Sequence, residues 1–409
     1  MEWRVPASGT GLQINAMSTF VVDWLNLLVR WSHLVVGIGW IGTSFYFIAL
    51  DLSLRKRENM RDGVAGTAWE VHGGGFYHVE KFTSAPKDLP PDLVWYQWEA
   101  YLTWVTGFLL LILQYYWHAE AYLISDAVLP LLPAQAVVIS VGSLILGWFA
   151  YDYLCKSSIG QRTTLLAGAV FVMIVGAAWF FSQVFSGRGA LIHVGAFIGT
   201  IMAVNVFGVI IPNQKKIIAA LVDNRIPDPR LGAVGKQRSV HNNYLTLPVL
   251  VLMVSAHYPM LTSHPHTWMV IALIVIMGGG VRHFLNRHDA GDPFAKIVWV
   301  LPVSAIALAA AIYVTDPPSA ASFADVKTSD EDVYRIVGSH CVMCHTEFPS
   351  QEGYAAPPKG VVLGSLDDVR RYSNEILAQA VFGNAMPLGN QNGMTRAERD
   401  ELGAWLVNN

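Results

Sequence analysis

The stretch TTLLAGAVFVMIVGAAWFFSQVF, residues 163–185, contains no charged side chain. A helix that crosses the hydrocarbon core of a bilayer needs about 20 predominantly apolar residues, and this stretch supplies them. A helix also satisfies its own backbone hydrogen bonds, which a spanning segment must do. Residues 163–185 therefore predict a transmembrane helix. With 53% hydrophobic and only 14% charged residues, the chain is expected to contain several such helices.

Seven other stretches meet the same requirement. In chain order, the predicted spans are Val21–Leu50, Val94–Tyr116, Ala134–Tyr151, Thr163–Phe185, Leu191–Ile211, Tyr244–Met260, Trp268–Phe284 and Phe294–Val314. The first span lacks the basic segment, short apolar run and small-residue cleavage site of a signal peptide, so we expect it to be retained as an anchor. The predicted fold is all-α, with a polytopic eight-helix membrane bundle.

Charge divides the chain into two parts. Residues 1–317 carry 20 Lys and Arg against 18 Asp and Glu, whereas residues 318–409 carry 7 against 12. The second part is richer in charge for its length, as expected of a small soluble domain, and residues 315–322 read as a hinge. Neither part has the basic excess that a nucleic acid backbone requires. We predict an integral membrane domain at 1–317 and a soluble domain at 318–409, with nucleic acid excluded as a partner.

The orientation follows from the basic residues between the spans, because Lys and Arg are retained on the cytoplasmic side. Most Lys and Arg residues between the spans form clusters on one side of the membrane, and the opposite side holds only Arg4 and Arg188 outside the spans. This asymmetry predicts a bacterial inner-membrane protein with the N-terminus and the soluble domain in the periplasm. The clusters follow the first, third, fifth and seventh predicted spans and comprise Arg55, Lys56, Arg57, Arg61, Lys81, Lys87, Lys156, Arg162, Lys215, Lys216, Arg225, Arg230, Lys236, Arg238, Arg282, Arg287 and Lys296.

A weak internal repeat is present in the membrane part. Residues 40–43, WIGT, are echoed by residues 197–200, FIGT, and residues 101–103, YLT, by residues 244–246, YLT. The eight spans would then form two parallel four-helix repeats, whose interface is a common place for a binding site. Matches this short also arise by chance among apolar helices, so both interpretations stay open.

The segment Cys341-Val-Met-Cys344-His345 carries the most specific signal in the chain. A C-x-x-C-H pattern indicates covalent attachment of a c-type haem, with both cysteines forming thioethers and the histidine binding the iron. A zinc or redox C-x-x-C lacks a second ligand pair here, because the one other cysteine is Cys155. We predict one haem c bound by Cys341, Cys344 and His345.

The second axial ligand of the iron is predicted to be Met386, in the loop before the last helix; Met394 is the alternative. Methionine opposite histidine raises the reduction potential and leaves no iron site for oxygen. The tail is therefore expected to be a class I-like cytochrome c that accepts electrons. Its predicted helices run over Asp330–Gly338, after Ser365 and after Thr395, the last two preceded by capping-box patterns with Asp368 and Glu398.

Ionisable residues inside membrane spans are expensive and mark candidate sites. His33 and His193 are candidate ligands of a non-covalent haem b, although each is equally explained by hydrogen bonding between helices. At the cytoplasmic ends, Glu99 lies among tryptophans and His241 precedes two asparagines. Carboxylate, imidazole, amide and aromatic groups are what a planar heterocycle requires, so Glu99 and His241 are the candidate catalytic bases. An interfacial tryptophan belt is the simpler explanation.

The eight spans, the Cys341–His345 motif and the segment Met386-Pro-Leu-Gly-Asn390 together resemble the membrane-bound cytochrome c urate oxidases, also called urate hydroxylases. The resemblance covers the whole chain, including Arg30–Thr43 and Gly73–Phe82. It implies oxidation of urate to 5-hydroxyisourate with water as the oxygen source, electrons passing to the haem and on to a respiratory-chain acceptor, without hydrogen peroxide. No motif of that family assigns the residues that bind urate.

Two other functions remain open from the sequence. The chain would carry electrons from a quinol to cytochrome c without any urate chemistry if it were a respiratory electron-transfer subunit. It would move a solute across the membrane if the tail were only a docking or sensing module. Urate oxidation predicts that urate itself reduces the haem, whereas neither alternative does.

Overall fold

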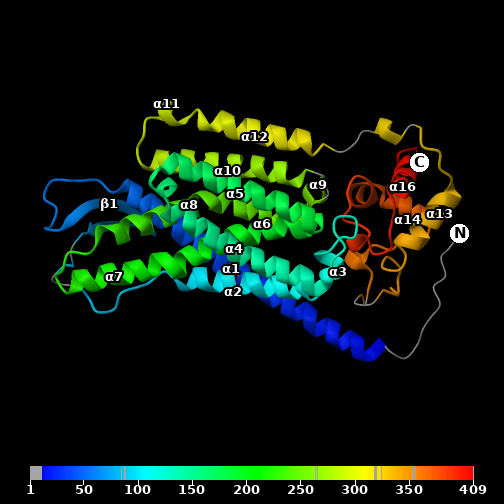
Figure 1. The fold of residues 1–409 in the computed structure, drawn as a ribbon, viewed down its shortest axis with the longest axis horizontal. Coiled ribbons are helices and arrows are strands. Elements are labelled where there is room, and N and C mark those ends of the chain that lie inside the picture. Colours follow the sequence, from blue (N-terminus) through cyan, green and yellow to red (C-terminus); the bar gives the residue numbers. More distant parts are fainter. Residues whose placement is uncertain are drawn as a thin grey trace.

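The structure is a computed structural model that describes residues 12–408 except 84, 87, 88, 263, 265, 317–319, 324, 352, 353 and 355. It consists of a long helical bundle with a smaller helical tail at one end (Figure 1). The elements of the bundle are α1 (Leu12–Ser53), β1 (Val64–His72), β2 (Gly75–Phe82), α2 (Trp98–Leu110), η1 (Leu111–Tyr116), α3 (Ala119–Tyr122), α4 (Pro133–Lys156), η2 (Ser158–Gln161), α5 (Thr163–Val184), α6 (Gly187–Val204), η3 (Asn205–Ile210), α7 (Ile211–Val222), α8 (Pro229–Val254), η4 (Ser255–His257), α9 (Pro259–Thr262), α10 (Thr267–Asp289), α11 (Phe294–Ile297) and α12 (Val300–Val314).

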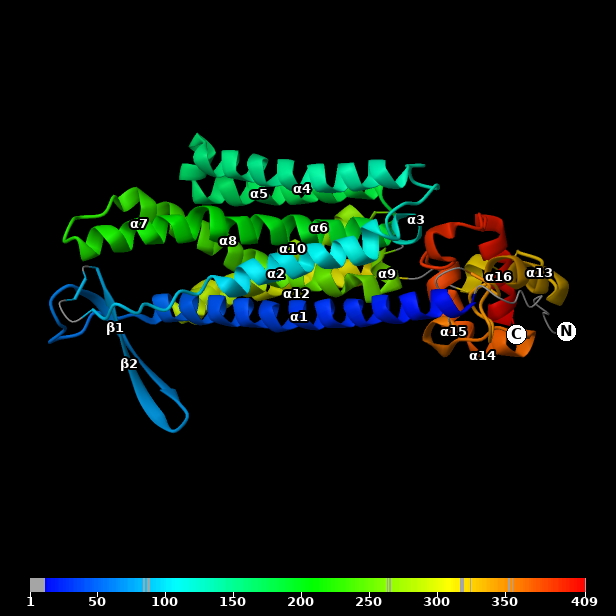
Figure 2. The same cartoon turned by 90° about the horizontal axis from the view of Figure 1, so that it is seen from below.

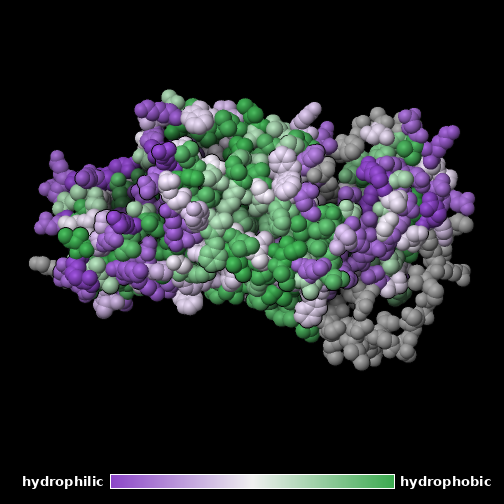
Figure 3. Space-filling view, in the orientation of Figure 1, coloured by the Kyte–Doolittle hydropathy of each residue, from purple (hydrophilic) through white to green (hydrophobic). Residues whose placement is uncertain are grey.

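Within the described residues, six helical segments are long and apolar enough to cross a membrane, so the chain is a multi-pass membrane protein. Figure 3 shows apolar side chains covering the middle of the bundle, between hydrophilic surface at its far end and on the tail. Two further helices, α2 continued by η1, and α8, run beside these six (Figures 1 and 2). The six segments are Phe20–Ser53, Pro133–Lys156, Thr163–Val184, Gly187–Val222, Thr267–Asp289 and Phe294–Val314.

Helix α6 forms the centre of the bundle. It packs against α2, α4, α5 and α8, while α10 packs against α5, α8 and α12. Segment Gly187–Val222 contains α6, and 67% of the residues in its most apolar window are buried. In the corresponding window of α1, none of the residues is buried. The proposed sequence repeat would make α1 and α6 equivalent. Their different burial does not favour a two-repeat arrangement.

The prediction of an all-α fold was wrong at the end of the bundle far from the tail. Strands β1 and β2 form an antiparallel hairpin with Trp69 opposite His78 and His72 opposite Gly75 (Figure 2). The turn is made by Gly73 and Gly74, which both have positive φ and meet no atom within 4 Å where a Cβ would be placed. Two glycines between runs of β-branched and aromatic residues indicate a β-hairpin. Apolar length, on which the predicted spans rest, does not detect this pattern.

Helix lengths also differ from those predicted. The fifth span was predicted to end at Ile211, but helix continues through α7 to Val222. The sixth was predicted to start at Tyr244, whereas α8 begins at Pro229 after the N-cap Asp228, whose side chain accepts from the Arg230 amide. The residues at the start of α8 are largely polar. They form a helical extension of the bundle beyond its apolar zone. His241 therefore lies in the middle of a helix and not at its entrance.

The tail contains the predicted helices. Asp330–His340 forms α13, Ser365 caps α14 through the Asp368 amide, and Thr395 exchanges hydrogen bonds with Glu398 at the start of the last helix. Trp405 is buried and donates from Nε1 to Asp330 at 2.7 Å, which ties the last helix to the first. The elements of the tail are η5 (Ala320–Phe323), α13 (Asp330–His340), η6 (Pro358–Gly360), α14 (Leu366–Arg371), α15 (Ser373–Ile376), η7 (Leu377–Val381), η8 (Leu388–Asn390) and α16 (Arg396–Asn408).

Two neighbouring glycines of α10 test how closely the central helices pack. A Cβ on Gly278 would lie 2.8 Å from Cδ and 3.0 Å from the nitrogen of Pro248 in α8, whereas a Cβ on Gly279 would meet no atom within 4 Å. We expect Gly278→Ala to destabilise the protein by about 1–3 kcal/mol through overpacking. Gly279→Ala should be neutral or slightly stabilising, because alanine favours helix. Thermal unfolding in detergent measures both, and equal melting temperatures for the two variants would contradict this crossing.

Candidate functional site

The C-x-x-C-H segment follows α13 directly. Cys341 and Cys344 are both free, and burial raises the pKa of the Cys341 thiol to about 12. His345 donates from Nδ1 to the carbonyl of Val361 at 3.1 Å, which leaves its Nε2 unprotonated and available. Among the described residues, no group of three or more His, Cys, Asp or Glu side chains is placed to hold a metal ion. These residues fit a covalently attached haem better than a zinc site.

Met386 lies in the loop between η7 and η8, and Arg399 of α16 holds this loop. The buried Arg399 donates from NH1 to the carbonyls of Met386 at 2.7 Å and Gly383 at 3.4 Å, and also to that of Ala380. Its NH2 donates to Asn390 Oδ1 at 3.2 Å. Met394, the alternative ligand, is 3% exposed and belongs to the tail core. Arg399, which the sequence analysis did not select, therefore holds the loop that carries Met386, and Met386 stays the predicted ligand.

His241 belongs to a polar network inside the bundle. Its Nδ1 lies 2.7 Å from the hydroxyl of Tyr151 on α4. The same hydroxyl accepts from Asn205 Nδ2 at 3.0 Å, and this amide also donates to Asn242 Oδ1 at 3.0 Å. Asn205 opens η3, a π-helical turn, and such turns are frequent at functional sites because they redirect side chains. The sequence indicated His241 and Asn242 but not Tyr151 or Asn205.

A buried ion pair adjoins this network. Arg238 is 1% exposed, donates to Asp152 Oδ1 at 2.7 Å and lies over the ring of Tyr151 at 4.9 Å. The other oxygen of Asp152 binds Lys156 Nζ at 2.6 Å. Asn205 Oδ1 and two nitrogens of Arg238, Nε and NH1, have no hydrogen-bond partner among the described residues. A buried pair of this kind holds α4 and α8 together.

Glu99 lies apart from His241. It is on the first turn of α2, where its side chain packs beside Gly39 of α1. Trp104, one turn further along α2, donates from Nε1 to Thr200 of α6 at 3.2 Å. Among the described residues, no hydrogen bond or ring contact joins Glu99 to His241. The two residues predicted as catalytic bases are therefore not in direct contact, and both stay predictions.

The two candidate haem b ligands also lie on different helices. His193 of α6 is fully buried, with Nε2 2.6 Å from Ser140 Oγ and Nδ1 2.7 Å from the Gly189 carbonyl. Nδ1 of His33 in α1 lies 3.0 Å from Thr106 Oγ1. Cε1 of the same ring would lie 3.0 Å from a Cβ placed on Gly107. Both ring nitrogens of His193 are engaged and His33 is packed against α2. These residues do not fit an additional haem, and no electron-transfer step is assigned to one.

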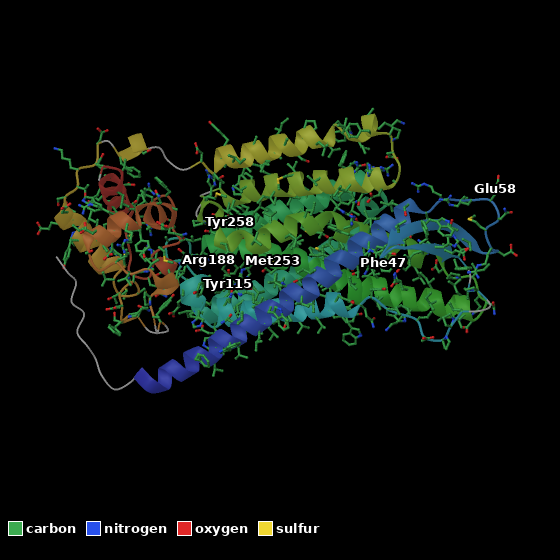
Figure 4. The ribbon with its side chains drawn as sticks, turned by 180° about the vertical axis from the view of Figure 1, so that it is seen from behind. Phe47, Glu58, Tyr115, Arg188, Met253 and Tyr258 are labelled. Atoms are coloured by element: carbon green, nitrogen blue, oxygen red, sulfur yellow. The ribbon has the colours of Figure 1, made fainter. Side chains whose placement is uncertain are left out.

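A cavity of about 410 Å³ lies where the tail meets the bundle. The tail packs here through η8 on α3 and η7 on α9. A Cβ on Gly389 would lie 2.6 Å from the carbonyl oxygen of Glu120, so the two backbones touch at this point. Figure 4 places Arg188, Tyr115 and Tyr258 at this end of the bundle. The sequence analysis named Met394, the alternative iron ligand, among the lining residues, but it did not predict the cavity, because the walls come from segments far apart in the chain.

The buried ion pair leads to a stability prediction. Asp152→Ala leaves Arg238 buried without its counter-charge, which should cost about 3–5 kcal/mol. Lys156→Ala removes a side chain that is 71% exposed and should cost less than about 1 kcal/mol. The double variant Asp152→Leu/Arg238→Met should recover much of the loss. Thermal unfolding in detergent compares the three, and an Asp152→Ala variant as stable as Lys156→Ala would show that the pair does not hold the helices.

Comparison with known families gives the identity of the membrane part. Residues 19–315 match the family described as urate oxidase N-terminal. No curated protein and no solved structure matches the chain. The matched region begins in α1, ends just after α12 and covers most of the chain. The resemblance seen in the sequence is thereby confirmed, and the chain belongs to the urate oxidase N-terminal family, the membrane-type urate hydroxylases.

Proposed function

We propose that the protein oxidises urate to 5-hydroxyisourate, with a haem c on its tail as the electron acceptor. Urate and one water give 5-hydroxyisourate, two electrons and two protons. The observation that carries the proposal is the coexistence, in one chain, of the urate oxidase membrane part at 19–315 and the C-x-x-C-H motif at 341–345. A substrate that releases electrons and a tail suited to receive them fit one reaction.

The tail residues that would hold the haem are Cys341 and Cys344 for covalent attachment and His345 and Met386 for the iron. With His345 and Met386 both holding the iron, the haem would supply a one-electron acceptor that does not react directly with oxygen, so no hydrogen peroxide would form. His345 is oriented for this role by the Val361 carbonyl, and Met386 by Arg399. The electrons would pass on to a respiratory-chain acceptor.

The arrangement in the membrane is part of the proposal. We infer that α2 with η1, and α8, cross the bilayer beside the six apolar segments, giving eight spans. The Lys and Arg clusters would face the cytoplasm and the tail the periplasm of a bacterial inner membrane, as the distribution of positive charge predicts. The hairpin β1–β2 and α7, which carry several of these basic residues, lie at the end opposite to the tail (Figure 1).

Where urate is oxidised is limited by the distance to the tail. His241 lies 13 residues before Val254, the last residue of α8, so it is about 20 Å from the end of that helix along its axis. Electron tunnelling weakens steeply with distance, and the described residues do not fit a haem in between. Glu99 and His241 therefore remain predicted proton acceptors, and the distance favours a substrate site nearer the tail.

Anaerobic titration with urate tests the reaction. Two electrons from each urate should reduce two haem centres, so half an equivalent of urate per haem is expected to convert the purified oxidised protein fully to the ferrous form. The visible spectrum follows the titration, with 5-hydroxyisourate or its decay product identified separately. If urate leaves the spectrum unchanged while a quinol reduces the haem, the protein is a quinol-oxidising electron-transfer subunit.

The transporter alternative is separated by a second readout. Urate uptake into vesicles that survives Cys341→Ala would favour transport, since that substitution removes one thioether and not the membrane part. Under the transporter alternative urate does not reduce the haem even in the wild type, so haem reduction in the wild type and uptake in this variant are two independent readouts.

The role of Arg399 in holding the Met386 loop gives a spectroscopic prediction. Arg399→Met removes the donors to three carbonyls and should let Met386 leave the iron, which weakens the charge-transfer band of methionine-ligated ferric haem and lowers the reduction potential. Arg335→Met is the control, because that arginine is 55% exposed and pairs only with Glu398 and Glu401. Covalent haem retained by both variants shows that the tail still folds. An unchanged band and potential in Arg399→Met would contradict the role.

A further inference from the structure

We propose that urate binds in the cavity between the tail and the bundle, with Arg188 as its principal cationic contact. This inference rests on the proposed function and names the site at which that function acts. The volume of about 410 Å³ lies within the range of about 300–1,000 Å³ typical of small-molecule sites. The bundle and the tail both contribute walls, so the site would not exist in either part alone.

The charge of the cavity suits an anion, and urate carries one negative charge near neutral pH. Among the described residues that line it are Arg188, Arg396, Arg399 and His264, and none is acidic. Arg396 pairs with Asp400 at 2.8 Å, and Arg399 is occupied by the carbonyls of its own loop. Within the described part of the chain, Arg188 has no carboxylate partner. It is the cation left to compensate a bound anion.

Arg188 is held in place from two sides. Its NH2 donates to the Ala256 carbonyl at 3.2 Å, and its guanidinium lies over the ring of Tyr122 at 5.6 Å. It is the second residue of α6, so the positive end of this long helix also points into the cavity. Ser186 caps the helix by accepting from the Gly189 amide at 3.0 Å. The backbone and the side chain therefore contribute positive potential at the same place.

The remaining lining suits a planar ring with carbonyl and N–H groups. The aromatic residues Tyr122 and Phe185 line the cavity together with Asn384. Nδ1 of His264 accepts from the amide of His266 at 3.0 Å, so in the neutral ring the hydrogen is on Nε2. His264 would then donate to a urate carbonyl. Aromatic surfaces with a few polar groups are the usual composition of such sites.

The cavity also lies beside the cysteine motif. Tyr122 neighbours Tyr354 of the tail. Burial is the main cause that raises the pKa of the Tyr354 hydroxyl, and the nearby Tyr122 and Cys344 raise this pKa further. Tyr354 thus lies near both the wall residue Tyr122 and Cys344. Electrons released in the cavity would not need to cross the bundle. The distance that argues against a site at His241 does not arise here.

Binding to the reduced protein tests the site without turnover, because a haem that is already ferrous cannot accept electrons from urate. We expect Arg188→Gln to weaken urate binding at least about tenfold, as measured by calorimetry on the dithionite-reduced full-length protein. Arg188→Lys keeps the charge and should restore part of the affinity. Arg371→Gln removes one exposed tail arginine that does not line the cavity and should change the affinity less than about twofold.

A second variant keeps the test independent of Arg188 and its folding. Ser182 of α5 lines the same cavity, so Ser182→Leu should fill part of it and also weaken urate binding, with the melting temperature and the haem spectrum unchanged. Wild-type affinity in both Arg188→Gln and Ser182→Leu would overturn the site. The proposed function would survive that result if urate still reduces the oxidised wild-type protein. If the wild type is not reduced by urate, the function fails whatever the variants do.

Discussion

The two ends of the bundle are separated by a hydrocarbon core of about 30 Å, and the tail packs against only one of them. The backbone contact between Gly389 and α3 fixes which end this is. A reaction whose electrons leave through the tail must therefore take place near that end, or must have carriers inside the bundle. His193 has both ring nitrogens in hydrogen bonds and His33 is packed against α2, so these two histidines do not fit such carriers. This constraint decides how the polar groups of the membrane part are interpreted.

The buried polar groups of the bundle then fall into two kinds. Asp152 and Arg238 neutralise each other, and Tyr151, Asn205 and His241 satisfy one another, so this network is explained by helix packing. The cavity at the tail differs, because its arginines outnumber its carboxylates. Charged groups that neutralise each other within the protein indicate a structural role. An unbalanced charge around a cavity indicates a ligand of opposite sign. Among the described residues, Asn205 Oδ1 and two nitrogens of Arg238 stay without a hydrogen-bond partner, and helix packing leaves these atoms unexplained.

Local signals in the sequence predicted local features well. Apolar stretches located the long helices, and Ser365 and Thr395 with their acidic partners located the starts of two tail helices. The hairpin was missed because the glycine pair at Gly73 was considered only as a loop. The cavity could not be predicted in this way, since α3, α6 and the Met386 loop meet only after the tail docks. His241 and Glu99 were selected by residue type, but their separation depends on helix packing that no local pattern records.

The arrangement at the tail also bears on the electron count. Oxidation of urate to 5-hydroxyisourate releases two electrons, while a single haem accepts one at a time. The half-oxidised molecule must stay bound until the first electron has moved on, and it must be kept from solvent meanwhile. A cavity walled on one side by the bundle and on the other by the tail suits both needs, because the two parts touch beside it at Gly389. Under the proposed function, a haem c on the tail would keep both electron transfers within one molecule, so that the second transfer would not depend on a new encounter.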